Sequence, residues 1–339
     1  MTSKERVHSA LLGQETDYCP VINPTTLVTY ESMLHTGCFF PQAHTDTDKM
    51  AALAAYGHTV LGFDTIMPYL SLHLEAAALS CQIDWGYADK LPSVTIYPIK
   101  DLREFTVPSN FLDRKPIKSL LAAIRILKHK HGKDTVIVGK VVGPWTLAYH
   151  LYGAANILMD IIIEPLRVVE ALHELKEISM LFAQAQMEAG ADMITWSDHV
   201  TGDLVSPQIY SDYLLPIHQD CMRKLQVPVV LHVCGNVMDR LHLFANGGFA
   251  AFHIDSRNPI PEALEIVKGK MMLTGNINIP NILLNGSTAE VREEVTAVIR
   301  DGIRLISPEC GLPTRVPNAN LFEVVKTARR CSCGKGVKA

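Results

Sequence analysis

The chain has 339 residues, of which 48% are hydrophobic and 19% charged, with a formal net charge of −4 at pH 7. This composition is typical of a compact globular protein and excludes a disordered chain, and the charge argues against nucleic acid as a partner. There is no apolar run of eighteen or more residues and no apolar segment after the polar N-terminus, so neither a membrane span nor a signal peptide is predicted. We therefore expect a cytoplasmic protein whose eight cysteines are mostly reduced.

Helical and strand patterns alternate along the chain. Thr2-Ser-Lys-Glu5 has the spacing of a capping box, which predicts a first helix to about Leu12, before any strand. Eight apolar runs of strand length follow, at residues 21–22, within 59–67, and at 135–142, 192–196, 229–231, 250–254, 271–273 and 303–306. Helical patterns lie at 25–58 in two pieces, 117–131, 144–159, 165–189, 206–225, 236–245, 261–267, 288–302 and 318–329, and residues 81–86 are a candidate hairpin.

Eight strands alternating with helices predict an α/β fold, a (β/α)8 TIM barrel with an N-terminal helical extension. No linker or short repeat divides the chain. We therefore expect a single barrel domain over residues 1–330, followed by a flexible C-terminal tail over residues 331–339 that carries Cys331 and Cys333.

The stretch from Pro228 to Asn236 contains the best candidate site. Its apolar run ends at His232, and Cys234 lies two residues further on, so both side chains project to the same side of an extended chain. Cys310 follows another predicted strand, and the strand ends of a barrel meet at one mouth. An imidazole and two thiolates from separate elements favour an open, catalytic zinc site. The alternative is that these cysteines are simply buried thiols.

Other residues at predicted strand ends are candidates for catalysis or for lining a cofactor cleft. Asp198 is a catalytic candidate, with His199 as its neighbour, and the alternative is an ordinary loop carboxylate. Asp255 is a candidate for catalysis, for a fourth metal ligand or for a partner of His232, and His253 is its rival on the same face. The cleft-lining candidates are Met67, Gly143, Trp145, for which simple packing is the alternative, and Asn276.

The remaining cysteines suggest no site. Cys19, Cys38, Cys81 and Cys221 are interpreted as buried or surface thiols. The pair Cys331-x-Cys333 resembles a metal or redox motif, but its place in a polar tail favours no role.

The motif Leu231-His-Val-Cys-Gly-Asn236, together with Pro308-Glu-Cys-Gly311, resembles the zinc motifs of the methylcobamide:coenzyme M methyltransferases, a group within the uroporphyrinogen decarboxylase superfamily. The similarity extends over nearly the whole chain and includes Gly143-Pro-Trp-Thr146, Glu188-Ala-Gly-Ala-Asp192 and Thr274-Gly-Asn276. The resemblance implies a TIM barrel with zinc at its mouth, held by His232, Cys234 and Cys310.

The sequence also departs from this superfamily in two places. The true decarboxylases carry an arginine-rich segment near the first strand, where this chain reads Val21-Ile-Asn-Pro-Thr-Thr26, so porphyrin decarboxylation is disfavoured. The methyltransferases have a glutamate near the position of Asp255, and the shorter aspartate leaves the fourth zinc position to Asp255, His253, water or substrate.

The resemblance implies an enzyme that moves a methyl group from a methylated corrinoid to a small thiol such as coenzyme M. Zinc would activate the thiol as a thiolate, Asp198 or Asp255 could take the released proton, and a corrinoid protein would dock at the barrel mouth. The alternatives are a different acceptor, such as tetrahydrofolate or another thiol, a decarboxylase-like enzyme, or a non-catalytic corrinoid-binding barrel with structural zinc.

Overall fold

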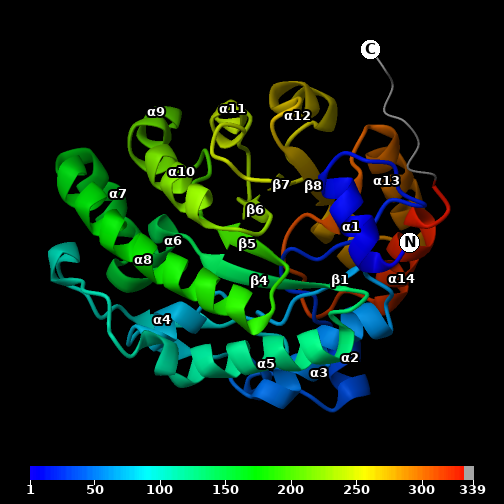
Figure 1. Ribbon diagram of the computed structural model, residues 1–339, viewed down its shortest axis with the longest axis horizontal. Helices are drawn as coiled ribbons and strands as arrows, with labels where there is room; N and C mark the ends of the chain where they lie inside the picture. The colour runs from blue at the N-terminus through cyan, green and yellow to red at the C-terminus, as the bar shows by residue number, and fades with distance from the viewer. Residues whose placement is uncertain (332–339) are drawn as a thin grey trace.

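The computed structural model describes residues 1–331, and seven parallel strands form one curved sheet at its centre (Figure 1). The strand order along the sheet is β1 (Thr65–Ile66), β4 (Val136–Val142), β5 (Met193–Ser197), β6 (Val229–His232), β7 (Ala251–Ile254), β8 (Met272–Ile277) and β9 (Leu305–Pro308). Neighbours in the sheet are also neighbours among these strands in the chain, as expected when each crossover packs a helix against the outer face.

A short extended segment closes the sheet into a barrel. Val21 forms a parallel bridge with Ile306 of β9, and the Asp64 N–H, next to β1, donates to the Val21 carbonyl. This segment is the eighth strand predicted from the sequence, so the (β/α)8 barrel is confirmed. Seven of the eight strands lie inside a predicted apolar run or extend at most two residues beyond it, and β8 extends four residues further than predicted.

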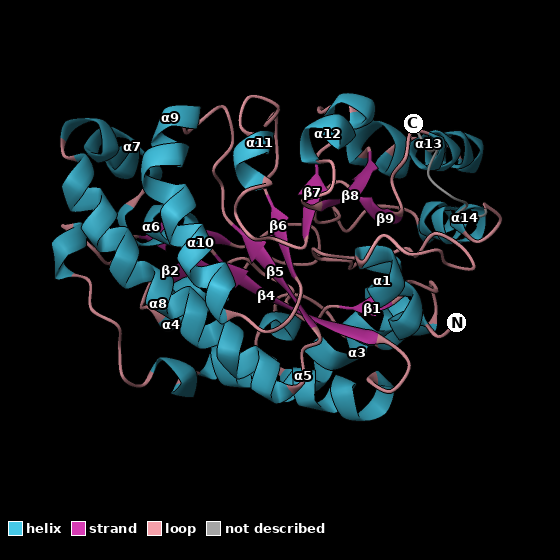
Figure 2. Ribbon diagram, turned by 45° about the horizontal axis from the view of Figure 1, so that its top comes forward, coloured by secondary structure: helices cyan, strands magenta, loops and turns pink. Residues whose placement is uncertain are grey.

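Helices surround the sheet on its outer face (Figure 2). Their apolar residues pack against the outward side chains of the strands, and the polar faces are exposed. The α-helices are α1 (Ser3–Leu11), α2 (Tyr30–Thr36), α3 (Thr47–Thr59), α4 (Leu74–Ala78), α5 (Lys115–His131), α6 (Pro144–Tyr152), α7 (Ala154–Ile163), α8 (Pro165–Ala189), α9 (Pro207–Ile209), α10 (Leu215–Lys224), α11 (Leu241–Phe244), α12 (Ile260–Val267), α13 (Thr288–Arg300) and α14 (Asn318–Ala328).

Shorter helical pieces complete the path of the chain. They are the 3-10 turns η1 (Gln42–His44), η2 (Leu102–Glu104) and η3 (Phe111–Asp113), and the π-helical segments η4 (Tyr210–Leu214) and η5 (Ile279–Leu284). The candidate hairpin is confirmed, because β2 (Gln82–Asp84) pairs antiparallel with β3 (Ser93–Ile96). The loop between these two strands extends over the barrel and, as described below, contributes to the wall of its cavity.

The N-terminal extension is tied to the barrel by buried charges. The capping box on Thr2 and Glu5 forms as predicted and starts α1. Arg6, which is 4% exposed, donates to Asp64 at 2.7 Å, and the other carboxylate oxygen of Asp64 accepts the Val21 N–H at 2.9 Å. A buried carboxylate needs such partners, so the ion pair also fixes the strand segment that closes the barrel.

Two sequence-based expectations are wrong. The predicted helix over 236–245 is reduced to α11, because the N–H groups of Val237 and Met238 bond to asparagine side chains instead of to an earlier turn. Cys19 is disulfide-bonded, not an isolated thiol, whereas Cys38, Cys81 and Cys221 are free. A strand-start cysteine packs like a small hydrophobe, and its sequence neighbourhood gave no sign of a pair.

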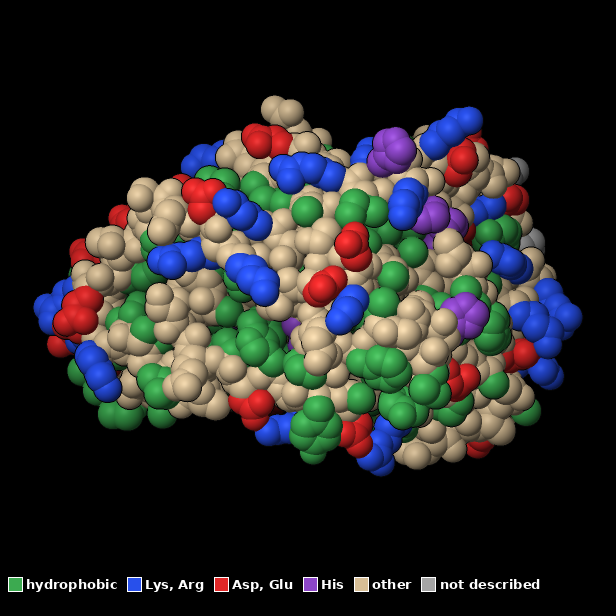
Figure 3. Space-filling model, turned by 90° about the horizontal axis from the view of Figure 1, so that it is seen from below, with side chains coloured by type: hydrophobic (Ala, Val, Ile, Leu, Met, Phe, Trp, Pro, Cys, Tyr) green, Lys and Arg blue, Asp and Glu red, His purple; other side chains and the backbone are tan. Residues whose placement is uncertain are grey.

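The surface charges and the helix lengths agree with what the composition predicts. Figure 3 shows basic and acidic side chains intermingled on the face seen from below. Within residues 1–331 no single helix is long and apolar enough to cross a membrane; only α6 and α7 taken together reach that length and composition, and they meet at a bend of 116°. The predicted tail lies outside the described residues, apart from Cys331.

Candidate metal centre

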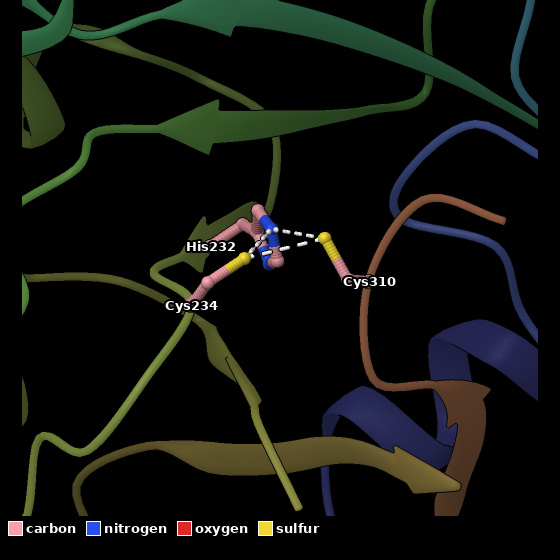
Figure 4. Close-up of side chains that lie close together, drawn as sticks. All are labelled: His232, Cys234 and Cys310. Atoms are coloured by element: carbon pink, nitrogen blue, oxygen red, sulfur yellow. Dashed lines mark hydrogen bonds between the residues drawn. The ribbon is translucent and has the colours of Figure 1, made fainter. Parts of the chain in front are cut away.

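The three predicted metal ligands lie together at the mouth of the barrel. His232 is the last residue of β6, Cys234 follows it by two residues, and Cys310 follows the end of β9 by two residues. The Cys234 Sγ atom lies 3.2 Å from Cys310 Sγ and 3.3 Å from His232 Nε2, and Cys310 Sγ lies 3.6 Å from His232 Nε2 (Figure 4). We call these three residues the ligand cluster.

The ligand cluster fits a zinc ion. Two thiols and one imidazole are zinc donors, and in a tetrahedral site with ordinary zinc–sulfur and zinc–nitrogen bonds the ligand atoms are separated by roughly 3.5 to 3.8 Å. The separations found are close to this range. The hydrogen bond between the two thiols raises the pKa of Cys234 and lowers that of Cys310 well below its ordinary value. One thiolate is therefore favoured within the pair.

The backbone that carries Cys234 is held by Asp255. Its carboxylate accepts the Gly235 N–H at 2.9 Å and bonds to the backbone and side chain of Arg257. Although burial alone would raise the pKa of Asp255, these hydrogen bonds lower it. Gly235 has φ +95°, and a Cβ there would lie 2.5 Å from Thr201 Oγ1, so glycine is required after the cysteine.

No fourth ligand from the described part of the chain completes the cluster. Among the described histidines, cysteines and acidic residues, only the three members gather at metal-binding distance. His253 bonds through Nε2 to the Pro308 carbonyl at 2.7 Å, and burial lowers its pKa to about 3. Asp255 is occupied by Gly235 and Arg257. The predicted protein candidates for the fourth position are thus engaged elsewhere, which leaves that side to a small molecule.

A cavity of about 520 Å³ opens above the ligand cluster. Its lining includes all three members of the cluster and the loop between β2 and β3. Tyr87 and Leu91 of this loop line the cavity and are also 58% and 72% exposed, so they mark its rim. The strand ends, the β2–β3 loop and the segment after Cys310 together make a deep and largely apolar cleft.

Asp198 lines this cavity, but its two oxygen atoms are occupied. Oδ1 accepts both the Thr146 N–H, at 2.8 Å, and the Thr146 hydroxyl, and Oδ2 bonds to His218 Nε2 at 3.0 Å. The Tyr210 hydroxyl bonds to the other ring nitrogen of His218. This network anchors the start of the loop after β5. The adjacent His199 is exposed to the cavity instead, and burial in that wall lowers its pKa.

The four cleft-lining candidates are buried but do not line the cavity. Met67 and Trp145 are at most 1% exposed, and the Trp145 ring packs edge-on against Tyr149. Gly143 lies against Asp198, where a Cβ would be 2.3 Å from Cγ, and Asn276 lies within β8 instead of at its end. Their role as cofactor contacts stays a prediction, and their positions favour packing.

Two groups of cavity residues escaped the sequence reasoning. Lys140 lines the cavity from the middle of β4, and a charged residue inside an apolar strand was the signal for it. His44 and His73 form a second group; His44 stacks on Phe40, and His73 stacks on His150. Burial lowers the pKa of His44 and His73 to about 4 and that of His150 to about 3, so this wall is uncharged at neutral pH.

Comparisons with known proteins agree with this geometry. A profile of the family described as uroporphyrinogen decarboxylase (URO-D) matches residues 2–331. The methylcobamide:CoM methyltransferase MtbA of Methanosarcina acetivorans is 33% identical over 334 residues, covering 97% of this chain and 98% of the relative. A second methylcobamide:CoM methyltransferase, MtaA of Methanosarcina barkeri, is 32% identical over 328 residues, which cover 96% of each chain. A solved methyltransferase from Methanosarcina mazei superposes with a TM-score of 0.94 at 32% identity, over 97% of this chain and 98% of the other.

Proposed function

The chain belongs to the uroporphyrinogen decarboxylase family, and from this premise we propose that it is an enzyme that transfers a methyl group from a methylated corrinoid to a small thiol. The observation that carries the proposal is the ligand cluster at the inner end of a cavity, with three donors and no fourth among residues 1–331. We also propose that residues 1–330 form one catalytic domain and that coenzyme M, named in the relatives' descriptions, is the acceptor.

A zinc ion held by His232, Cys234 and Cys310 would supply the Lewis acidity that keeps a substrate thiol deprotonated and nucleophilic. The residues of the chain then divide the remaining tasks. Asp255 fixes the turn that presents Cys234, through the Gly235 N–H. Asp198 fixes the next loop, through Thr146 and His218.

Proton transfer falls to a side chain that faces the cavity. Asp198 and Asp255 were the sequence candidates, but hydrogen bonds occupy both carboxylates. His199 presents a neutral imidazole to the cavity, because burial lowers its pKa. We assign the uptake of the thiol proton to a ring nitrogen of His199, and a positioning role to Asp198.

The corrinoid is too large to be enclosed in the cavity and therefore meets the thiol at the rim. The exposed side chains of Tyr87 and Leu91 give this rim an apolar character that suits the corrinoid and the protein that carries it. Porphyrin decarboxylation is less well supported. The cavity lining contains a single arginine, Arg315, which is paired with Asp89 at the rim, whereas the decarboxylases carry an arginine-rich segment that this chain lacks at Val21–Thr26.

Two measurements on purified protein test the proposal. Metal analysis should find about one zinc per chain, which Cys234→Ala and Cys310→Ala each lose, while Cys38→Ala, a change at a free thiol outside the cluster, keeps it. The wild type should demethylate free methylcobalamin in the presence of coenzyme M, followed by the absorbance change of the corrinoid. If the protein demethylates methylcobalamin with tetrahydrofolate but with no thiol, tetrahydrofolate and not coenzyme M is the acceptor.

The competing assignment is a non-catalytic barrel with structural zinc. A structural site is closed by four protein ligands and does not exchange with added thiol. If the metal-loaded protein shows no change in metal coordination on titration with a thiol, and no turnover with any acceptor, the catalytic assignment is wrong.

A further inference from the structure

Lys140 is a buried cation that faces the interior of the barrel. It is 3% exposed, and its backbone N–H and carbonyl both bond to the side chain of Gln186 on α8. A Cβ on the preceding Gly139 would meet Gln186 as well, so position 139 faces the surrounding helices. Because side chains alternate along a strand, Lys140 points the opposite way, into the cavity that it lines.

The ammonium group of Lys140 has no hydrogen-bond or ion-pair partner among residues 1–331. It lies over the Tyr69 ring, 5.6 Å from Nζ to the centroid, and its charged neighbours are Glu75 and the two cysteines of the ligand cluster. The neighbouring Glu75 is occupied by the Tyr69 hydroxyl and by the Val142 N–H. A buried charge that lacks hydrogen-bond and ion-pair partners destabilises the folded protein. Such a position is explained if a ligand supplies the counter-charge.

Two hydroxyls on the next strand are unpartnered in the same region. Parallel pairing places Thr195 opposite Lys140, and Ser197 opposite Val142, so these side chains share the interior face. Within residues 1–331 the buried hydroxyl oxygens of Thr195 and Ser197 have no hydrogen-bond partner. Lys140 and Ser197 line the cavity, and Thr195 lies behind them on the same face, outside the lining. We call these three residues the polar floor; it presents one cation and one hydroxyl donor to the cavity.

We propose that the polar floor binds the anionic end of the acceptor thiol while its sulfur lies at the ligand cluster. This inference rests on the proposed function and adds the group that selects the acceptor. A sulfonate or carboxylate suits the polar floor, since its oxygens accept hydrogen bonds from an ammonium and from a hydroxyl at once.

The spacing of the two groups limits the length of the thiol. Ser197 pairs with His232 of the ligand cluster, and Lys140 pairs with Thr195, two residues further down the same strand, so the backbone of Lys140 lies two residues below the cluster. Two residues of a strand span about 6.5 Å. A chain of two or three carbon atoms between sulfur and anion covers this distance, so short anionic thiols are favoured over neutral thiols.

The test compares two thiols of equal reach, 2-mercaptoethanesulfonate and 2-mercaptoethanol, with methylcobalamin as donor. Lys140→Met should raise KM for the sulfonate roughly 10- to 100-fold, the range for loss of a hydrogen bond to a charged group, and should leave kcat/KM for the neutral thiol within about threefold. Ser197→Ala should have a smaller effect in the same direction. Equal losses for both thiols would overturn the proposal.

The competing role for Lys140 is charge compensation of the two cysteine thiolates. In that case Lys140→Met would reduce the zinc content and would impair both thiols alike. The subsite proposal requires that Lys140→Met retains about one zinc per chain. Lys140→Gln, which keeps a polar end group, serves as a second variant if the methionine variant is poorly folded.

A binding measurement separates this proposal from the proposed function. 2-Hydroxyethanesulfonate carries the anion but no thiol, and it should raise the melting temperature of the wild type and not that of Lys140→Met. The control is Lys90→Met, because Lys90 also lines the cavity but is paired with Asp84. This variant should retain the wild-type shift. No shift in the wild type, or the same shift in all three proteins, rejects the polar floor whether or not the protein transfers methyl groups.

Discussion

At the scale of single residues, the ligand cluster could be predicted and the polar floor could not. His232 and Cys234 are two apart after an apolar run, and Cys310 follows another such run, so residue type and spacing were enough. Lys140 was visible as a charge within an apolar strand, but its meaning depends on the inward direction of its side chain and on the hydroxyl of Ser197, which has no hydrogen-bond partner among the described residues. These features appear only when β4 and β5 are paired.

The same contrast holds for the acidic candidates. Asp198 and Asp255 were correctly expected near the barrel mouth, because both follow strands that end there. Their roles depend on which groups bond to their oxygens, and those partners, such as His218 and Gly235, come from other elements. Sequence position therefore gave the neighbourhood of these residues, and their hydrogen bonds support the positioning roles that we propose for them in place of proton transfer.

The buried His44 makes a prediction about acid stability. Burial lowers its pKa in the folded state to about 4, from an ordinary value near 6.5. Between these values the unfolded chain binds a proton that the folded chain does not, so stability is lost as the pH falls through this window and is unaffected above it. This one residue should account for the loss of about 2 kcal/mol of unfolding free energy between pH 7 and pH 5.

His44→Phe keeps the stacking on Phe40 and Trp85 and removes the titration. Urea unfolding at pH 7 and pH 5 should then show a smaller difference than in the wild type, by about 2 kcal/mol. The matched control is His129→Phe at an exposed position, which should keep the wild-type difference. If both variants lose as much unfolding free energy in acid as the wild type does, protonation of His44 does not destabilise the folded protein.

At the scale of elements, the alternation of helices and strands followed from apolar periodicity, and all eight barrel strands were located. The failures have local causes. The helix expected over 236–245 contracts to α11 because Asn236 and Asn258 side chains capture the first N–H groups. The extension of β8 to Ile277 includes Gly275 and Asn276, residue types that normally signal the end of a strand.

The junction of β4 and α6 predicts a steric effect. The backbone of Gly143 is not left-handed and does not by itself require glycine. A Cβ there, however, would lie 2.3 Å from Asp198 Cγ and 2.5 Å from its Oδ2. Gly143→Ala should therefore displace Asp198 from Thr146 and His218 and lower the unfolding free energy by about 1 to 3 kcal/mol, the usual cost of overpacking. Denaturant unfolding measures this loss.

A second glycine in the wall of the site provides the control. A Cβ on Gly311 would make only ordinary contacts, at 3.7 Å and beyond, with Thr26. Gly311→Ala should stay within about 0.5 kcal/mol of the wild type. If the two variants unfold alike, the loop at Asp198 adapts freely and this aspartate does not fix the geometry of the site.

At the scale of the whole molecule, barrel closure brings distant parts of the chain to one mouth. The cavity draws on the segment after the first strand, the β2–β3 loop, β4, β5, β6 and the segment after β9. The pairing of Val21 with Ile306 completes this ring. The strand count predicted the barrel, but the place of the β2–β3 loop over the mouth could not be derived, because an irregular excursion carries no periodic signal about where it packs.

The position of that loop predicts how the methyl donor is delivered. Leu91 is 72% exposed on the rim of the cavity, where a corrinoid carried by a protein would have to approach. Leu91→Glu places a charge in this apolar surface. Docking of the carrier protein should weaken, with kcat/KM for the protein-bound methyl donor falling about tenfold, which corresponds to about 1.4 kcal/mol for an unpaired charge at the solvent-exposed rim. Free methylcobalamin needs no docking partner, so its kcat/KM should fall less than about threefold.

The control is Leu12→Glu, at an equally exposed leucine at the end of α1, which should leave kcat/KM for both donors unaffected. Equal losses for both donors would place Leu91 in the corrinoid contact itself, and no loss for either would move the docking surface away from the β2–β3 loop.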